Sequence, residues 1–195
     1  MDFFFSCAST YTYLSVMRVD KLAEAAGVAV RWRPFNLGEI TREQNNRPFV
    51  GKPVKMKYMW RDVERRANQH GIPFAGIPPY PVDADRLAHR LAVLAAQQGW
   101  CPRFTNALYH QWFIEHKQPG DPAVLRDVLG ALGKDAASLL AQADSQETVT
   151  QLSAETDVAR QLGIFGSPTF VVEGEIFWGD DRLEAALDWS RKAGS

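Results

Sequence analysis

The pattern of apolar and polar positions predicts a β-α-β unit at the start of the chain. Residues 3–5 form a short, continuous run of phenylalanine, which is typical of a strand buried on both faces. Apolar residues then recur at helical spacing over 11–26, and Gly27 stands where a left-handed helix cap is expected. Alternating positions over 28–33 predict a second strand. A crossover of this length favours parallel pairing of the two strands.

The middle of the chain changes to helical periodicity, with Gly, Pro or Asp between the segments. Asp121 and Pro122 supply a cap followed by a proline at the first helical position. No strand pattern interrupts this block, so we expect a helical bundle. The predicted helices span 55–70, 84–98, 103–116, 123–132 and 136–143.

The C-terminal part returns to a mixed pattern. A helix over 147–162 leads to two short apolar runs, 169–172 and 176–178, which predict a β-hairpin with a glycine-containing turn. A last helix over 181–191 follows, with Asp180 available as its cap. The two ends therefore read β-α-β and α-β-β-α around a helical block.

Composition and charge narrow the classes of function. The 195-residue chain has 46% hydrophobic and 23% charged positions, enough to bury a core. Its net charge of -1 provides no broad basic field, which argues against nucleic acid as a partner. The first residues lack a basic region, and no apolar stretch approaches the roughly 20 residues of a membrane span. We therefore expect a cytoplasmic protein with no signal peptide and no membrane anchor.

The cysteines and histidines predict neither a disulfide framework nor a metal site. Only Cys7 and Cys101 are present, far apart and without a CxxC pair, so both read as free thiols in a reducing compartment. Glycine-rich phosphate loops and GxSxG elbows are also missing from the sequence. No metal is expected, because the four histidines show no ligand spacing: His70, His89, His110 and His116.

Ser9 lies on the predicted turn between the first strand and the first helix. Backbone N–H groups and the positive end of a helix dipole converge at such a turn and stabilise an anion. Ser9 or Thr10 could instead cap the helix, and the two roles are compatible. Cys7 is an alternative nucleophile, although a cysteine in a strand-like run is typical of a small buried side chain.

Three further stretches carry polar groups that could recognise a ligand. Ser167-Pro168 precedes a strand expected beside the Ser9 turn, and a cis bond there would turn the Ser167 backbone towards an extended peptide. A trans proline that starts an edge strand is the alternative. Residues 44–48 lead into a basic helix start, which by itself indicates a solvated loop. Asp180 and Asp181 could hold an ammonium group or begin a helix.

Together, these stretches resemble the 2-hydroxychromene-2-carboxylate isomerases, which are relatives of the kappa-class glutathione transferases. In that family an α/β, thioredoxin-like fold is interrupted by an inserted all-helical domain. The resemblance implies a thioredoxin-like domain over 1–36 and 147–195 and an inserted helical domain over 37–146. The motifs that carry it are 3–14, Asn46-Arg47-Pro48, 55–59, 165–169 and 178–182.

The resemblance places Ser9 at the position of the family's active serine, which activates the sulfur of glutathione. Disulfide oxidoreductases of this fold carry CxxC here, whereas this chain reads Ser9-Thr10-Tyr11-Thr12 and cannot shuttle a disulfide. Thr10 replaces the usual proline and Thr12 the second serine, so the turn departs from the family pattern. The Ser9 hydroxyl would donate a hydrogen bond to the thiolate.

Glutathione is the cofactor that the resemblance implies, and its charges match the candidate residues. It is an extended tripeptide with two carboxylates and one ammonium group. Lys55 would reach the glycyl carboxylate, Ser167 would pair with the cysteinyl backbone ahead of a cis Pro168, and the acidic pair would bind the γ-glutamyl end. The full set of expected contacts is Asn46, Lys55, Ser167, Pro168, Asp180 and Asp181.

By the same resemblance the substrate is a small aromatic compound, 2-hydroxychromene-2-carboxylate, in naphthalene-type catabolism, and the protein pairs as a homodimer. A kappa-like transferase and a non-catalytic thioredoxin-like binding module are the two alternatives. Trp32, Phe35 and Trp178 could form an aromatic wall or belong to the core. Candidates for gripping the substrate carboxylate are Arg33, Arg47 and Lys57.

Overall fold

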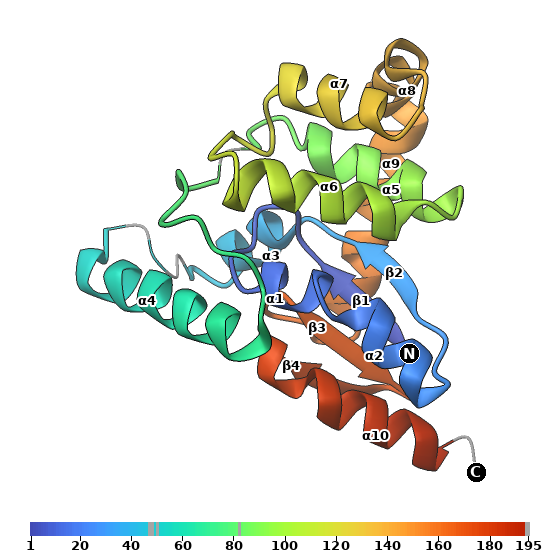
Figure 1. Ribbon diagram of the computed structural model, residues 1–195. Coiled ribbons are helices and arrows are strands. Elements are labelled where there is room, and N and C mark those ends of the chain that lie inside the picture. The colour runs from blue at the N-terminus through green and yellow to red at the C-terminus, as the bar shows by residue number, and fades with distance from the viewer. Residues whose placement is uncertain (47–48, 50, 82, 194–195) are drawn as a thin grey trace.

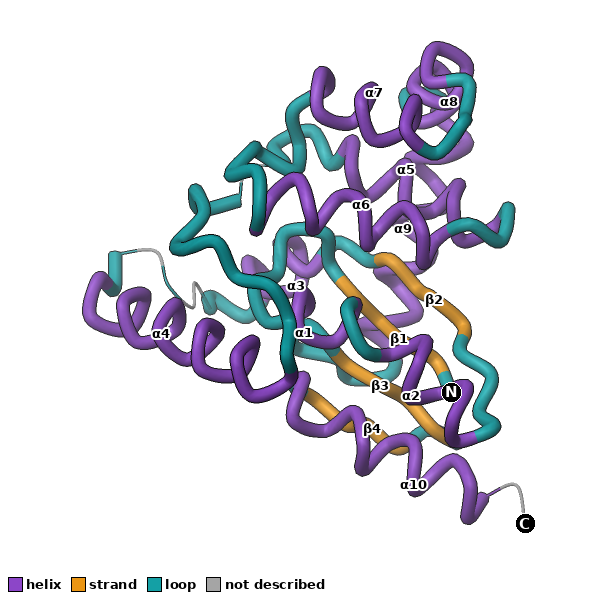
Figure 2. Tube along the Cα trace, viewed as in Figure 1, coloured by secondary structure: helices purple, strands orange, loops and turns teal. Residues whose placement is uncertain are grey.

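The computed structural model describes residues 1–46, 49, 51–81 and 83–193. Its centre is a four-stranded mixed sheet in the order β2-β1-β3-β4 (Figures 1 and 2). The strands are β1 (Asp2–Phe5), β2 (Arg31–Pro34), β3 (Thr169–Val172) and β4 (Glu175–Trp178). β1 pairs with β2 in parallel and with β3 antiparallel, and β3 pairs antiparallel with β4. The predicted parallel pair and the predicted hairpin are both confirmed.

Alternation along β1 divides the core into two layers. Phe3 and Phe5 are fully buried with Trp32 and Phe170 on one face of the sheet, while Phe4 is buried with a second cluster on the other face. The apolar run therefore forms a central strand because helices cover both of its faces.

Helices lie on both faces of the sheet and continue beyond it as a block. α2 and α10 pack together on one face, and α9 lies against the other (Figure 1). α5 to α8 build the helical block at the β2 side of the molecule (Figure 2). The helices are α1 (Thr12–Val16), α2 (Val19–Ala26), α3 (Leu37–Glu43), α4 (Pro53–His70), α5 (Leu87–Gln97), α6 (Cys101–Phe113), α7 (Pro122–Ala131), α8 (Ala136–Ala143), α9 (Gln146–Gln161) and α10 (Leu183–Ala193), with a 3₁₀ turn, η1 (Asp180–Arg182), before α10.

The expected single helix over 11–26 is wrong, because it is broken into α1 and α2 at Arg18. The buried guanidinium of Arg18 donates to the carbonyl of Leu14 at 3.1 Å and to the carbonyl of Asp180 at 3.0 Å. These contacts hold Arg18 with φ -127, outside the helical range. The left-handed cap at Gly27 is confirmed, with φ 67.

The helical block agrees with the prediction except at several boundaries. α5 begins at Leu87 instead of residue 84, because Arg86 is left-handed with φ 59 and its N–H bonds to the Asp83 carbonyl. α3 was not predicted from the sequence pattern. The Asp121 cap is confirmed, because its carboxylate accepts from the N–H of Ala123 at 2.8 Å. No helix among the described residues combines the length and apolar character needed to cross a bilayer.

Candidate functional site

The Ser9 turn, residues 6–11, connects β1 to α1 and meets a distant segment of the chain. The hydroxyl of Ser9 donates to the carbonyl of Ser167 at 2.8 Å, and the N–H of Ser9 donates to the Ser6 carbonyl at 3.1 Å. α1 begins only at Thr12 and has no side-chain cap. The expectation that Ser9 or Thr10 caps this helix is therefore wrong, since the Ser9 hydroxyl reaches across to Ser167.

The Ser167-Pro168 peptide bond is cis, and it lies directly before β3. Ser167 is buried, and its Oγ accepts from the N–H of Ser6 at 2.9 Å and shares a hydrogen bond with Thr12 Oγ1 at 2.8 Å. Antiparallel pairing of β1 with β3 brings these segments together. The structure thus places Ser9 and Ser167 side by side, as the strand pattern predicted.

Tyr109 supports the Ser9 turn from the helical block. This fully buried residue of α6 directs its hydroxyl at the carbonyls of Ser6 and Ser9, each at 3.0 Å. Burial raises the pKa of Tyr109 well above its ordinary value, so the phenol keeps its proton and stays a donor. The helical block therefore helps to build the site.

The surroundings of Cys7 differ from those of a nucleophilic cysteine. It is buried, and its thiol faces the carbonyl of Ala88 at 3.6 Å. Burial, followed by the negative charge of Asp83, raises the pKa of the Cys7 thiol well above 9.0. Only the thiolate is a strong nucleophile, so the burial and the raised pKa of this thiol argue against Cys7 as the nucleophile.

The two aspartates of η1, just before α10, have different surroundings. Asp180 is buried, and Arg66 contacts its carboxylate through two nitrogens at 2.9 and 2.8 Å. Burial raises the pKa of Asp180, while the charges of Arg66 and Arg18 oppose that rise. Asp181 is exposed and forms an ion pair with Arg182 at 3.2 Å. Asp180 also makes no cap to the last helix, contrary to the expectation, because it lies inside η1.

Asn46 lies before α4 and Lys55 lies in its first turn, and both are exposed. The ammonium of Lys55 lies 5.6 Å from the centre of the Phe49 ring. α4 has neither a side-chain cap nor an acidic residue in its first turn, and the positive end of a helix dipole attracts a carboxylate there. Of the residues expected to grip a substrate carboxylate, Lys57 is exposed on α4, whereas Arg47 lies outside the described residues.

The third candidate, Arg33, is already occupied. It forms ion pairs with Asp2 at 3.1 Å and with Glu155 at 2.8 Å, and its guanidinium covers the Phe4 ring. These contacts belong to the α9 face of the sheet, so Arg33 has a structural role.

The expected aromatic wall is reduced to one member. Of the two alternatives for Trp32 and Phe35, a substrate wall or the core, the structure supports the core, because both are buried. Trp178 remains 52% exposed and pairs edge-on with Phe165, which is 44% exposed, at 4.8 Å between ring centres. Both residues adjoin the Ser167 segment, because the Trp178 indole lies against Gly166. The sequence pattern did not single out Phe165 as part of this pair.

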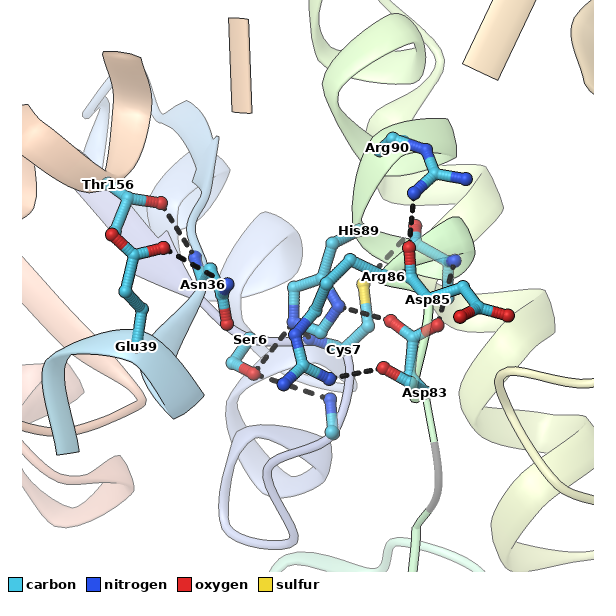
Figure 3. A network of polar contacts seen from close by, with 12 residues as sticks. Ser6, Cys7, Asn36, Glu39, Asp83, Asp85, Arg86, His89, Arg90 and Thr156 are labelled. Carbon is cyan, nitrogen blue, oxygen red and sulfur yellow. Dashed lines mark hydrogen bonds and ion pairs between the residues drawn. The ribbon is translucent and has the colours of Figure 1, made fainter. Parts of the chain in front are cut away.

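A second polar group behind the Ser9 turn was missed by the sequence pattern (Figure 3). His89 Nε2 lies 2.9 Å from Ser6 Oγ, and His89 Nδ1 lies 2.5 Å from a carboxylate oxygen of Asp83. All three residues are buried. Their separation in sequence follows no helix or strand period, so only the fold reveals that they meet.

The chain belongs to the DsbA-like thioredoxin family, because the model of the DSBA-like thioredoxin domain matches residues 1–188. Within this family it is similar to the 2-hydroxychromene-2-carboxylate isomerase of Sphingobium xenophagum, with 28% identity over 94% of each chain. It is also 24% identical to glutathione S-transferase kappa 1 of Caenorhabditis elegans, over 96% of this chain and 89% of the relative. The resemblance to these two groups is confirmed.

Solved structures agree with this placement. A selenomethionine 2-hydroxychromene-2-carboxylate isomerase superimposes with a TM-score of 0.85 at 25% identity, covering 99% of this chain and 95% of the other. The cytosolic disulfide reductase DsbM of Pseudomonas aeruginosa, in a structure with GSH, gives a TM-score of 0.66 at 16% identity, covering 99% and 96%. The second match supports the thioredoxin-like fold alone.

Proposed function

We propose that the protein is a glutathione-dependent isomerase that interconverts 2-hydroxychromene-2-carboxylate and trans-o-hydroxybenzylidenepyruvate. The main support is the contact of the Ser9 hydroxyl with the Ser167 carbonyl, 2.8 Å apart, beside the cis bond to Pro168. A hydroxyl at this turn, with the neighbouring Cys7 buried and protonated, suits activation of a bound thiol and does not suit disulfide exchange.

Glutathione would bind along the Ser167 segment. Its cysteinyl N–H would donate to the Ser167 carbonyl, as one strand does to another. That hydrogen bond would replace the one from Ser9, and the Ser9 hydroxyl could then rotate towards the sulfur. A hydrogen bond donated to the thiolate favours the charged form and lowers the pKa of the thiol.

The two ends of glutathione would be recognised through different charged groups, a carboxylate at the glycyl end and an ammonium at the γ-glutamyl end. Lys55 and the uncapped start of α4 would attract the glycyl carboxylate, with Asn46 beside them. At the γ-glutamyl end, exposed Asp181 would contact the ammonium group, while buried Asp180 would hold the segment through Arg66.

The proposed reaction begins with opening of the hemiketal ring of the substrate: the ring C–O bond breaks, the hydroxyl proton passes to the phenolic oxygen, and a ketone forms. The glutathione thiolate then adds to the double bond that is conjugated with this ketone. A C–S bond forms, the π-electron pair moves to the conjugated carbonyl oxygen, and a single bond replaces the double bond. Rotation about that bond and elimination of the thiolate regenerate glutathione. The sequence of steps leaves no net oxidation or reduction.

The naphthalene-type pathway, a cytoplasmic location and a homodimer remain parts of this proposal, as does the domain division at 37–146. A kappa-like transferase is the second candidate, because a kappa transferase also matches nearly the whole chain. It would use the same Ser9 contact but release a stable conjugate.

The experiment follows interconversion of the two aromatic acids by absorbance, with and without glutathione. Glutathione-dependent conversion should fall about 10²-fold in Ser9→Ala, the usual loss for one donor that stabilises a developing anion. Conversion that is unaffected by omitting glutathione would contradict the proposal. Tight glutathione binding without conversion, together with a stable conjugate from another electrophile, would favour the transferase.

A further inference from the structure

Three buried polar residues form a hydrogen-bonded group that joins the first residue of the Ser9 turn to α5 and the segment before it (Figure 3). Ser6, His89 and Asp83 are only 3%, 2% and 5% exposed. The imidazole joins them, with Nε2 at 2.9 Å from Ser6 Oγ and Nδ1 at 2.5 Å from Asp83. Such a serine-histidine-aspartate arrangement resembles a hydrolase triad, but the burial of Ser6 keeps any substrate away from its hydroxyl. These three residues must therefore act on neighbouring residues of the protein.

The hydrogen bonds fix which nitrogen of His89 carries the proton. The N–H of Cys7 points at Nε2 at 3.2 Å, and a backbone N–H can only donate. Nε2 is therefore an acceptor, and Nδ1 donates its proton to Asp83. The Ser6 hydroxyl must then also donate to Nε2.

The surroundings of Asp83 support this arrangement. Burial raises its pKa, but hydrogen bonds from His89 and the Ala88 N–H, with the charge of Arg86, outweigh burial and hold the pKa below its ordinary value. Asp83 is thus a carboxylate at neutral pH and accepts from His89.

Ser6 connects His89 to the proposed glutathione site. Its N–H donates to Ser167 Oγ at 2.9 Å, and its carbonyl accepts from the N–H of Ser9 at 3.1 Å. The two polar groups of its backbone therefore contact the two serines of the proposed glutathione site. A shift of Ser6 would move both serines.

We propose that Asp83 and His89 are positioning residues, which hold Ser6 and Cys7 so that the Ser9 hydroxyl faces the Ser167 segment. The inference rests on the proposed role of Ser9. It extends that role to a pair of residues that touches neither glutathione nor substrate.

Three substitutions and one matched control separate positioning from general stability. In Asp83→Asn, the Ala88 N–H at 3.3 Å from Oδ1 keeps that oxygen in place, so the new amide N–H₂ would face His89. His89 would then shift its proton to Nε2 and oppose the Cys7 N–H, as a wrong tautomer does in a catalytic triad. His89→Gln keeps an acceptor near Cys7, whereas His89→Ala removes it. Val93→Ala, which empties a buried position on the same helix, is the matched control.

The first measurement is the steady-state kinetics of isomerisation, together with glutathione affinity and the melting temperature. Asp83→Asn and His89→Ala should lower kcat by about tenfold or more, since small displacements of a reacting group are costly. Glutathione affinity should fall by a smaller factor than kcat, because Ser167 is also held by Thr12 and by the start of β3. His89→Gln should recover most of kcat. Equal loss of kcat in Val93→Ala at the same drop in melting temperature would overturn the proposal.

A second measurement does not depend on isomerase activity. Ser9→Cys introduces a thiol at the turn, and its pKa is read from the pH dependence of alkylation. Cys7 and Cys101 should not be alkylated, because burial raises the pKa of both thiols. Adding Asp83→Asn should shift that pKa and slow alkylation at pH 7 by about threefold or more. An unchanged pKa in a folded double variant would overturn the positioning role, whereas failure of isomerisation with a shifted pKa would overturn only the proposed function.

Discussion

The Ser9 turn and the approach to α4 belong to one proposed site but are built in opposite ways. Around Ser9, the contacts described above are buried or half-buried, and they join the turn to α1, α5, α6 and the Ser167 segment. Asn46 and Lys55 are exposed, and the ammonium of Lys55 contacts only a ring face at 5.6 Å among the interactions described. The Ser9 turn is preorganised for the proposed reaction, whereas Asn46 and Lys55 would lose side-chain freedom when glutathione binds. Changes at the centre should therefore alter stability and kcat, and changes at the edge should alter affinity.

The largest effect is expected from Gly166→Ala. A Cβ at this position would lie 2.1 Å from Nε1 of Trp178, so either the indole or the Ser167 segment must move. We expect the free energy of unfolding to fall by about 1–3 kcal/mol, as in other overpacked sites, with a parallel loss of kcat. Urea denaturation and the isomerase assay measure both.

Gly130→Ala is the matched control for this change. A Cβ there would meet nothing within 4 Å, and Gly130 lies inside α7. Replacement of a helical glycine by alanine should stabilise the protein by up to about 1 kcal/mol. If both variants behave alike, the Ser167 segment is not tightly packed and the proposed contrast between centre and edge fails.

Tyr109→Phe should produce the next largest effect. The ring keeps its contact with Phe113, but the carbonyls of Ser6 and Ser9 lose a buried donor. A lost partner of this kind costs about 1–2 kcal/mol, and kcat should fall because the Ser9 turn loosens. Tyr58→Phe, at a residue 62% exposed, should leave both quantities unchanged. A stable Tyr109→Phe variant with full activity would show that the helical block does not position Ser9.

The sequence could predict the parts of this site that depend on neighbouring residues. The apolar run of β1 and the left-handed turn at Glu173 and Gly174 are local features, and they place Ser9 and Ser167 at one end of adjacent strands. The break at Arg18 could not be predicted, because it depends on Asp180 and Glu184, far along the chain. His89 was missed for the same reason, since its partners come from the Ser9 turn and from the segment before α5.

A smaller effect on stability is expected when the pH is lowered. The pKa of Asp83 is lower in the folded protein than its ordinary value of 3.8, so the unfolded chain binds the proton more readily. The stabilisation from Asp83 is therefore complete above about pH 3.8 and is lost as the pH falls through the folded pKa. Below pH 4, urea denaturation should show a steeper loss of stability in wild type than in Asp83→Asn. Parallel curves would mean that Asp83 has no favourable partner in the folded state.

The smallest effect is expected at the exposed edge, from Lys55→Met. Removal of one exposed cation should weaken glutathione binding by about two- to fivefold, because a solvent-exposed ion pair contributes up to roughly 1 kcal/mol. The difference in glutathione affinity from wild type should shrink as the salt concentration rises. The Debye length is about 8 Å at physiological ionic strength, and added salt shortens it further and screens the charge of Lys55. Lys57→Met, two residues along the same helix and also exposed, should leave glutathione affinity unchanged. Titration calorimetry at two salt concentrations gives the affinities, and kcat at saturating glutathione completes the comparison. A loss of glutathione affinity with constant kcat would place Lys55 at the edge of the site. A fall in kcat would mean that the ammonium acts on the reacting centre and that centre and edge are not separate.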